Sequence, residues 1–407
     1  MTVWAKLKKW GVTGACDYCL CRLRNLRIGC FFKRNAAAHT KEPQLGITVV
    51  GHLSDCGSLN KTLRDFCFAL KDAGIPFQTW DLGSHVIPRE DVEPISTDRG
   101  NFRITKYTHL VEMIQSPVPD GLVKHRARIV FWEFESGLLQ GYPVLMERPG
   151  DIIGMSDFNF NYYKTIFNGK RTAHKLLYPL RFTDKDLLSK EDARRRFGIA
   201  PDAFVVFYNF SYKSGIDRKN PEGALRAFAK GVAQKDNSLM VFKTAASSEY
   251  PRRVIRLQEL TKELGVSDKV IFIDEYLTEQ DVFNLTNACD VYLSLHRAEG
   301  FGLGIAEAMA LGKPVIVTDY SSTKEFCNET NSIPVGYKMV AMEKSENRLY
   351  SDAKMWADPD IDAAAAALEK IYNDPTFAVK IGLSAKKSIR DQYSNSRFKE
   401  SILQFLS

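Results

Sequence analysis

Short apolar runs alternate with longer amphipathic stretches along most of this 407-residue chain. Runs such as residues 45–53 (LGITVVGHL) and 204–211 (FVVFYNFS) have the length of buried strands, and each is followed by a loop and a stretch with helical periodicity. A strand, a loop, a helix and a further strand at this spacing form a βαβ unit, whose two strands are parallel. The alternation therefore predicts an α/β fold with parallel sheets that helices cover on both faces.

The alternation occurs twice, before and after a connector at residues 176–203. We expect an N-terminal Rossmann-like domain at residues 41–182, a C-terminal Rossmann-like domain at residues 183–385 and a helical segment at residues 386–407. Two doubly wound domains that face one another enclose a central cleft, and ligands of such sheets bind at the carboxyl ends of the strands. Candidate site residues should therefore follow the ends of strands.

Residues 1–40 differ from the rest of the chain in their charge. They contain eight Lys and Arg residues and a single acid, Asp17, and so account for the whole formal net charge of +7. Trp, Leu and Phe residues are interleaved with these cations, a composition that suits the surface of an anionic membrane. A solvated tail and a nucleic acid-binding arm are the alternatives, and we expect the membrane as a partner and no nucleic acid.

The cysteines and the apolar runs indicate the compartment. No apolar run approaches the ~20 residues that cross a bilayer, and residues 1–40 lack the uninterrupted apolar region of a secretion signal. The eight cysteines do not indicate a disulfide scaffold, and Cys16 and Cys19 lack the second CxxC pair of a structural zinc site. We expect plain or lipid-modified thiols, no bound metal, and a cytoplasmic protein, peripheral on the inner face of the membrane.

The stretch HRAEGFGLGIAEAMALGKP at residues 296–314 places two acids around a glycine-rich turn. The turn leads from a strand-like run into a helix, whose N-terminus offers amide groups to a phosphate. Glu299 and Glu307 flank the turn, and a carboxylate accepts hydrogen bonds from two hydroxyls of a sugar or a ribose. An ordinary strand–helix corner is the alternative. The turn residues that we expect to bind the ligand are Gly300, Phe301, Gly302 and Leu303.

Cations gather near the ends of two strands in the same half of the chain. Residues 213–221 (KSGIDRKNP) follow one strand and include Lys213, Arg218 and Lys219, and Lys243 ends the next strand. Cations that converge on the glycine-rich turn would neutralise a diphosphate, whose charge builds up as it leaves. A solvated basic loop is the alternative interpretation.

These motifs resemble those of the retaining glycosyltransferases of family four, which have the GT-B fold. EGFGLGIAE is similar to the E-x7-E signature of that family, and RKNP matches its basic loop. FWEFE (residues 131–135) and WADPD (residues 356–360) resemble segments of a bacterial branch of polysaccharide type. The resemblance is strong over residues 204–375 and moderate over residues 45–180.

The resemblance implies a role for each matching residue. Glu299 would bind hydroxyls of the donor sugar, Glu307 the ribose, and Arg218 and Lys219 the phosphates, while Tyr276 lies where the family places the nucleobase. The implied enzyme is a hexosyltransferase that needs no metal or cofactor. It moves a sugar, with retention of configuration, from a nucleotide-diphospho-sugar to a hydroxyl of a glycan or a lipid-linked acceptor bound by the N-terminal domain.

The N-terminal half departs from the family pattern in one loop. The family often has a G-x-G turn after the first strand, whereas DCGSLNKTLR (residues 55–64) has Gly57 alone. We expect Gly57 and Ser58 to contact the donor through their backbone amides. His109 is the candidate for a catalytic histidine that contacts the sugar, with a core or surface histidine as the alternative.

Two rival functions stay open. One is an epimerase, a hydrolase or a phosphorylase on the same fold, although a phosphorylase needs a lysine that carries pyridoxal phosphate and usually a longer chain. The other is a catalytically silent protein that binds a sugar nucleotide or a glycan. The retained Glu299, Glu307, Arg218 and Lys219 argue against a loss of activity, and the altered loop at Gly57 argues for it.

Overall fold

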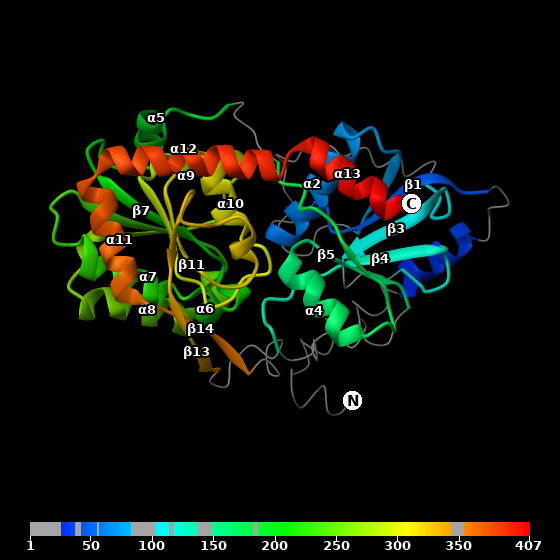
Figure 1. Cartoon of the computed structure of the whole chain (residues 1–407), viewed down its shortest axis with the longest axis horizontal. Coiled ribbons are helices and arrows are strands. Elements are labelled where there is room, and N and C mark those ends of the chain that lie inside the picture. The colour runs from blue at the N-terminus through cyan, green and yellow to red at the C-terminus, as the bar shows by residue number, and fades with distance from the viewer. Residues whose placement is uncertain are drawn as a thin grey trace.

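The computed structural model of the chain describes residues 26–36, 42–54, 57–82, 102–113, 118–136, 149–181, 186–342 and 354–407. They form two α/β domains that lie side by side, each built on a parallel sheet of six strands with helices packed against it (Figure 1). The prediction of an α/β fold with two parallel-sheet domains is confirmed.

The N-terminal sheet has the strand order β2-β1-β3-β4-β5-β6. Its strands are β1 (Gln44–Gly51), β2 (Phe77–Asp81), β3 (Tyr107–Met113), β4 (His125–Ile129), β5 (Asp151–Gly154) and β6 (Ala173–Lys175). The helices α2 (Ser58–Asp72) and α4 (Asp157–Phe167) belong to this domain. Because β1 lies inside the sheet, its last six residues are all buried, which explains their nearly continuous apolar sequence.

The C-terminal sheet has the strand order β12-β11-β10-β7-β8-β9. Its strands are β7 (Phe204–Asn209), β8 (Ser238–Thr244), β9 (Val270–Asp274), β10 (Val291–Ser294), β11 (Val315–Thr318) and β12 (Ile333–Val335). Its α-helices are α5 (Lys190–Arg196), α6 (Ile216–Lys219), α7 (Pro221–Gly231), α8 (Pro251–Glu263), α9 (Glu279–Ala288), α10 (Leu303–Ala310) and α11 (Ile361–Asn373). Short 3-10 turns are η1 (Tyr212–Ser214), η2 (Ser247–Glu249), η3 (Ser267–Lys269) and η4 (Ser321–Glu325).

The strand order of the C-terminal sheet reverses between β7 and β10, which are hydrogen-bonded neighbours. The chain proceeds from β7 outward to β8 and β9, and from β10 outward in the other direction to β11 and β12. The loops that follow β7 and β10 therefore diverge at the carboxyl edge of the sheet. Ligands of doubly wound sheets bind at such a point of divergence.

The last two helices join the two domains. α12 (Pro375–Gln392) runs along the C-terminal domain toward the N-terminal one, and α13 (Asn395–Leu406) lies on the N-terminal domain (Figure 1). The Phe398 ring of α13 packs edge-on against Phe66 of α2, with 5.9 Å between the centroids. The predicted boundary at residues 385 and 386 is therefore wrong, because it falls inside α12, and α13 completes the N-terminal domain.

Residues 26–36 form a helix that packs on the N-terminal domain. Phe32 is fully buried in a cluster with Val50 and Phe102, and the Asn35 side chain bonds to the backbone of Phe102 and Ile104. The predicted leader at residues 1–40 is thus divided: residues 26–36 are part of the fold, whereas residues 1–25, with Cys16, Cys19 and Cys21, lie outside the described residues. No described helix combines the length and the hydropathy that a bilayer crossing needs.

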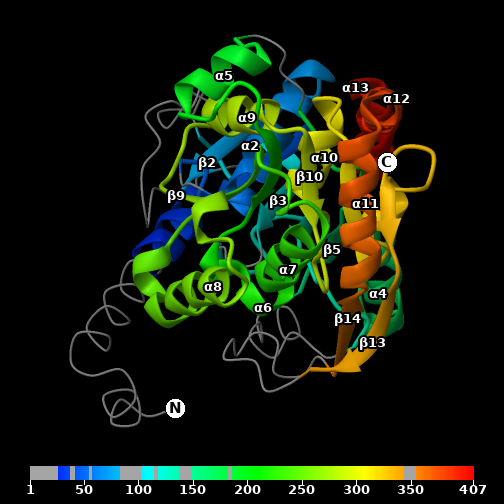
Figure 2. The same ribbon diagram turned by 90° about the vertical axis from the view of Figure 1, so that its left-hand side faces the viewer.

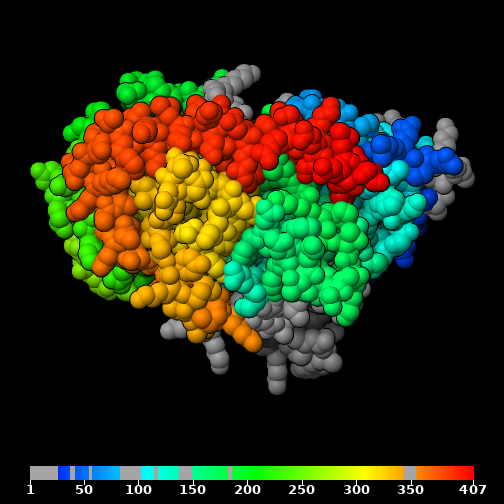
Figure 3. Space-filling model, viewed as in Figure 1, coloured from blue at the N-terminus to red at the C-terminus, as the bar shows by residue number. Residues whose placement is uncertain are grey.

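An antiparallel pair of strands lies where the domains meet. β13 (Tyr337–Ala341) pairs with β14 (Met355–Pro359), which contains most of the WADPD motif, and Figure 2 shows the pair beside α4. Trp356 of β14 is buried with Trp132 of the N-terminal domain in an interdomain cluster of ten buried residues. Figure 3 shows the two domains in contact along this face, with the C-terminal helices extending over both.

Candidate functional site

The loops after β7 and β10 carry the predicted basic and acidic motifs and are bonded to each other. The basic motif folds into η1 and the one-turn helix α6, and the acidic motif connects β10 to α10. The backbone N–H of Arg297 donates to the Arg218 carbonyl at 2.7 Å, and the Asn220 side chain donates to the Leu295 carbonyl at 2.8 Å. These bonds hold the two loops in a single unit at the edge where ligands are expected.

Glu299 is the centre of this unit. Its carboxylate is paired with the ammonium of Lys219 and lies 3.3 Å from Nη1 of Arg218, and the residue is only 7% exposed. Burial alone would raise the pKa of Glu299, but the two cations more than offset it and lower the pKa to about 2. Glu299 therefore stays ionised at neutral pH and can accept hydrogen bonds from hydroxyl groups.

The turn before α10 and the start of that helix require glycine at residues 302 and 304. Gly302 has a φ of +93°, and a Cβ there would lie 2.7 Å from Cγ2 of Thr323. A Cβ on Gly304 would lie 2.5 Å from both the Asn209 Oδ1 and the Tyr292 hydroxyl. Phe301 is buried and stacks on Tyr178 of the N-terminal domain at 3.9 Å between centroids. Its ring therefore holds the turn against the opposite domain.

Glu307 faces the N-terminal domain. It is the fifth residue of α10 and so lies beyond the first turn of that helix. One of its carboxylate oxygens lies 3.7 Å from Nζ of Lys61, which also pairs with Asp65 on the same helix α2. Burial raises the pKa of Glu307 to about 7, since the lowering by Lys61 is opposed by Asp65 and Glu279.

Lys61 was not among the predicted site residues. It lies in the first turn of α2, just after the loop in which Gly57 replaces the richer glycine pattern. Gly57, with a φ of +121°, precedes the helix, and both it and Ser58 are exposed. The sequence feature that points to Lys61 is its position near the start of a helix that follows the end of a strand. Backbone contacts from Gly57 and Ser58 to a donor stay a prediction.

His109 does not lie at this site. It is in the amino-terminal half of β3, stacked on His125 at 4.8 Å between centroids and covered by Phe405 of α13. Burial and His125 lower its pKa to about 4. The cleft lies at the carboxyl ends of the strands, so the prediction that His109 contacts the sugar is contradicted, and the core histidine is the correct alternative.

The remaining predicted cations and the tyrosine lie farther out. Lys213 is 41% exposed and pairs with Glu249 at 2.8 Å, and Tyr276 is 38% exposed in the loop after β9. Lys243 lies at the carboxyl end of β8 with an incompletely buried side chain. Donor contacts by these three residues stay predictions, as does chemistry without a metal. Within the described ranges, no three His, Cys, Asp or Glu side chains are grouped as metal ligands would be.

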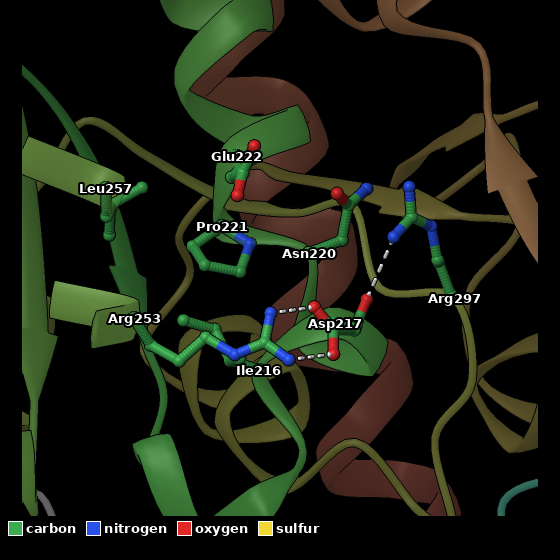
Figure 4. A pocket seen from close by; sticks show the side chains of 8 residues that line it. All are labelled: Ile216, Asp217, Asn220, Pro221, Glu222, Arg253, Leu257 and Arg297. Atoms are coloured by element: carbon green, nitrogen blue, oxygen red, sulfur yellow. Dashed lines mark hydrogen bonds and ion pairs between the residues drawn. The ribbon is translucent and has the colours of Figure 1, made fainter. Parts of the chain in front are cut away.

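A pocket of about 130 Å³ lies behind the basic loop (Figure 4). Arg253 of α8 chelates the Asp217 carboxylate with bonds of 2.7 and 2.8 Å, and Arg297 donates to the Asp217 carbonyl. The pocket is smaller than the ~300–1,000 Å³ of typical ligand sites. Its paired charges brace α6, which presents Arg218 and Lys219 to Glu299.

Two solved structures share this architecture over almost their whole length. One is HepE of Anabaena in complex with UDP-glucose, with a TM-score of 0.62, 15% identity and coverage of 89% of this chain and 99% of that chain. The other is sucrose-phosphate synthase of Thermosynechococcus elongatus, with a TM-score of 0.63, 15% identity and coverage of 89% and 98%. The chain therefore has the two-domain fold of the GT-B class.

The family is defined by the C-terminal domain. Residues 189–388, just under half of the chain, match the model of the glycosyl transferases group 1. The alpha-1,3/1,6-mannosyltransferase ALG2 of Dictyostelium discoideum is 25% identical over 257 residues, which cover 62% of this chain and 52% of that protein. The chain spans about half the length of the first curated relatives that it matches. It is a glycosyltransferase family four-like protein.

The raised pKa of Glu307 predicts a loss of stability as the pH rises. The pKa of a glutamate in an unfolded chain is about 4.3, whereas burial raises the pKa of Glu307 in the folded protein to about 7. Between these values the folded state keeps a proton that the unfolded state has released, so the free energy of unfolding falls with pH. Between pH 5 and pH 8 the free energy of unfolding should therefore fall by about 2–3 kcal/mol less in Glu307→Gln than in the wild-type protein, because one pKa unit corresponds to about 1.4 kcal/mol.

Urea unfolding of both proteins at the two pH values measures this difference. Glu299→Gln is the matched control, because the pKa of Glu299 is about 2 and its titration ends below this window. Glu325, whose pKa burial also raises to about 7, contributes equally to all three proteins. An unchanged decline in Glu307→Gln would show that Glu307 is ionised throughout.

Proposed function

We propose that this protein is a retaining glycosyltransferase, which moves a hexose from a nucleotide-diphospho-sugar to a hydroxyl of a glycan or a lipid-linked acceptor. The observation that carries the proposal is the buried carboxylate of Glu299, paired with Lys219 and Arg218 at the carboxyl edge of the sheet. This arrangement offers hydrogen-bond acceptors to sugar hydroxyls and cations to phosphates at the same point.

The relatives support this type of donor. The family of the C-terminal domain consists of glycosyl transferases, HepE is described in complex with UDP-glucose, and ALG2 is a mannosyltransferase. In the proposed complex Glu299 binds hydroxyls of the hexose and Glu307 binds the ribose, which takes over the contact that Lys61 now makes. The nucleotide sugar is a substrate, and no cofactor is part of the proposal.

The proposed mechanism rests on stabilisation of the leaving group. As the bond between the anomeric carbon and the diphosphate breaks, negative charge develops on the phosphate oxygens. Arg218, Lys219 and the positive N-terminal end of α10 lie where they can stabilise this charge without rearrangement. The acceptor oxygen bonds to the anomeric carbon from the side of the departing diphosphate, whose oxygen takes the acceptor proton in the simplest form of this front-face displacement.

A panel of nucleotide sugars tests the function. A donor at 100 times its Kd should stabilise the protein by about 2.7 kcal/mol, which thermal unfolding detects. Release of nucleoside diphosphate is then measured with and without acceptor glycosides. A transferase is stimulated by acceptor and a hydrolase is not, whereas a silent binding protein is stabilised but releases nothing.

Removal of the two cations that pair with Glu299 should abolish most of the activity. We expect the combined substitutions Arg218→Ala and Lys219→Ala to lower kcat/KM at least roughly 100-fold. This corresponds to a loss of about 3 kcal/mol in transition-state stabilisation, the size of effect found for preorganised charge donors. The control is Lys230→Ala, which removes an exposed cation of α7 that is paired with Asp362 and lies outside the predicted site. Steady-state kinetics with the donor from the panel measure this loss, and a loss below tenfold would show that Arg218 and Lys219 do not stabilise the transition state.

We also propose that the basic N-terminal region binds an anionic membrane surface. The exposed face of helix 26–36 carries Arg27, Lys33 and Arg34 beside Leu26, which is 60% exposed, and this helix contains no acid. Each cation near an anionic surface contributes about 1 kcal/mol. A transferase with a lipid-linked acceptor would meet its substrate at that surface.

Charge removal tests this without disturbing Phe32, which a truncation of the region would remove from the core. The triple variant Arg27→Gln, Lys33→Gln, Arg34→Gln should bind phosphatidylglycerol-containing vesicles about 3 kcal/mol more weakly, roughly 100-fold, in a sedimentation assay. The control replaces three exposed lysines of α12 and α13 by Gln: Lys380, Lys387 and Lys399. Equal sedimentation of both triple variants would contradict the proposal.

A further inference from the structure

The segment after β4 brings a third carboxylate to the cleft. Val130, Trp132 and Phe134 are each at most 2% exposed and lie in the interdomain cluster. Successive side chains of an extended segment point to opposite sides. Phe131 and Glu133 therefore point away from that cluster, toward the glycine-rich turn, where Gly300 approaches Phe131 so closely that a Cβ on it would lie 3.0 Å from the Phe131 Cβ.

Glu133 contacts the same arginine as Glu299. Its Oε1 lies 3.6 Å from Nη2 of Arg218, while Nη1 of that guanidinium lies 3.3 Å from Glu299. Arg218 is thus placed between one carboxylate of each domain. The Glu133 side chain is 14% exposed, so part of it stays accessible to a ligand.

The surroundings of Glu133 raise its pKa above that of an ordinary glutamate. The groups that face it are Arg218 and Lys219 of α6 and Glu299 of the acidic loop. Burial raises the pKa of Glu133 and the Glu299 carboxylate raises it further, while the two cations oppose this shift without cancelling it. A carboxylate with a raised pKa is a better proton acceptor at neutral pH than an ordinary glutamate.

We propose that Glu133 is a catalytic residue on the acceptor side, which binds the attacking hydroxyl and takes its proton. The inference rests on the proposed transfer reaction. The acceptor oxygen forms its bond to the anomeric carbon, and the bond between that carbon and the phosphate oxygen breaks with its electron pair remaining on the nucleoside diphosphate. The proton of the acceptor hydroxyl passes to Glu133 and then to solvent. Neither the basic loop nor the glycine-rich turn supplies a group with this position.

The test compares Glu133→Gln with Glu135→Gln, which changes the exposed glutamate two residues further along the same segment. The rate of nucleoside diphosphate release is measured for the full chain, with the most active donor of a panel that includes UDP-glucose and GDP-mannose, and with octyl glycosides or water as acceptors. We expect Glu133→Gln to lower kcat at least about 100-fold, the usual size of a general base effect. The Kd for the nucleoside diphosphate should change by less than about threefold. Such a factor corresponds to about 0.7 kcal/mol of binding free energy, since a factor of ten corresponds to about 1.4 kcal/mol.

The pH profile separates proton transfer from a structural role. In the wild-type enzyme kcat should fall on the acid side with an apparent pKa above the ~4.3 of ordinary glutamate, and Glu133→Gln should lose this dependence. Glu133→Asp keeps the carboxylate and should retain the acid limb at a reduced kcat. If Glu133→Gln does not fold, the pH profile of Glu133→Asp decides. An apparent pKa of its acid limb equal to that of the wild-type enzyme overturns the inference, and a shifted apparent pKa supports it.

The outcomes distinguish this inference from the proposed function. A kcat of Glu133→Gln within tenfold of wild type, or an intact acid limb, overturns the role of Glu133 and leaves the diphosphate as the proton acceptor. Transfer by the wild-type enzyme would still stand in that case. A wild-type protein that neither binds nor turns over any donor of the panel overturns both.

Discussion

The buried ion pairing of Glu299 with Lys219 and Arg218 is the interaction on which the site depends. Burial alone would raise the pKa of this carboxylate, and its cations keep it ionised, while the cations would be unfavourable in the same place without it. Their positions require the one-turn helix α6, which is held by Asp217, Arg253 and the backbone bond to Arg297. The charge of the site is thus prepared before any ligand arrives, which is the condition for electrostatic catalysis.

Contacts across the cleft complete the environment of this ion pair. Lys61 and Glu133 come from the N-terminal domain and face Glu307 and Arg218 of the C-terminal domain. Trp132 and the stacked rings of Tyr178 and Phe301 are buried in the same part of the molecule. A charge pair in such surroundings interacts more strongly than on the surface, and so each domain alters the titration of groups in the other.

The sequence predicted the features that local pattern determines. Strand-length apolar runs identified both sheets, and because Arg218 and Glu299 follow strand ends, parallel topology brings them to one edge. Partners across the cleft are not predictable in this way, since no local pattern encodes how one domain docks on another: the motif FWEFE stands out in the sequence, but nothing in it assigns a role to Glu133. The prediction for His109 was wrong for a related reason: an alternating apolar pattern identifies a strand but does not show which part of that strand lies at the cleft.

Phe66 of α2 acquires its partner Phe398 only from the far end of the chain. A ribosome releases the N-terminal strands long before α13 has been synthesised, and domains otherwise tend to fold in order of their emergence. Until α13 has been synthesised, Phe66 of α2 lacks its contact with Phe398, and His109 lacks its contact with Phe405. The N-terminal domain therefore reaches its final packing only after the C-terminal domain has been synthesised.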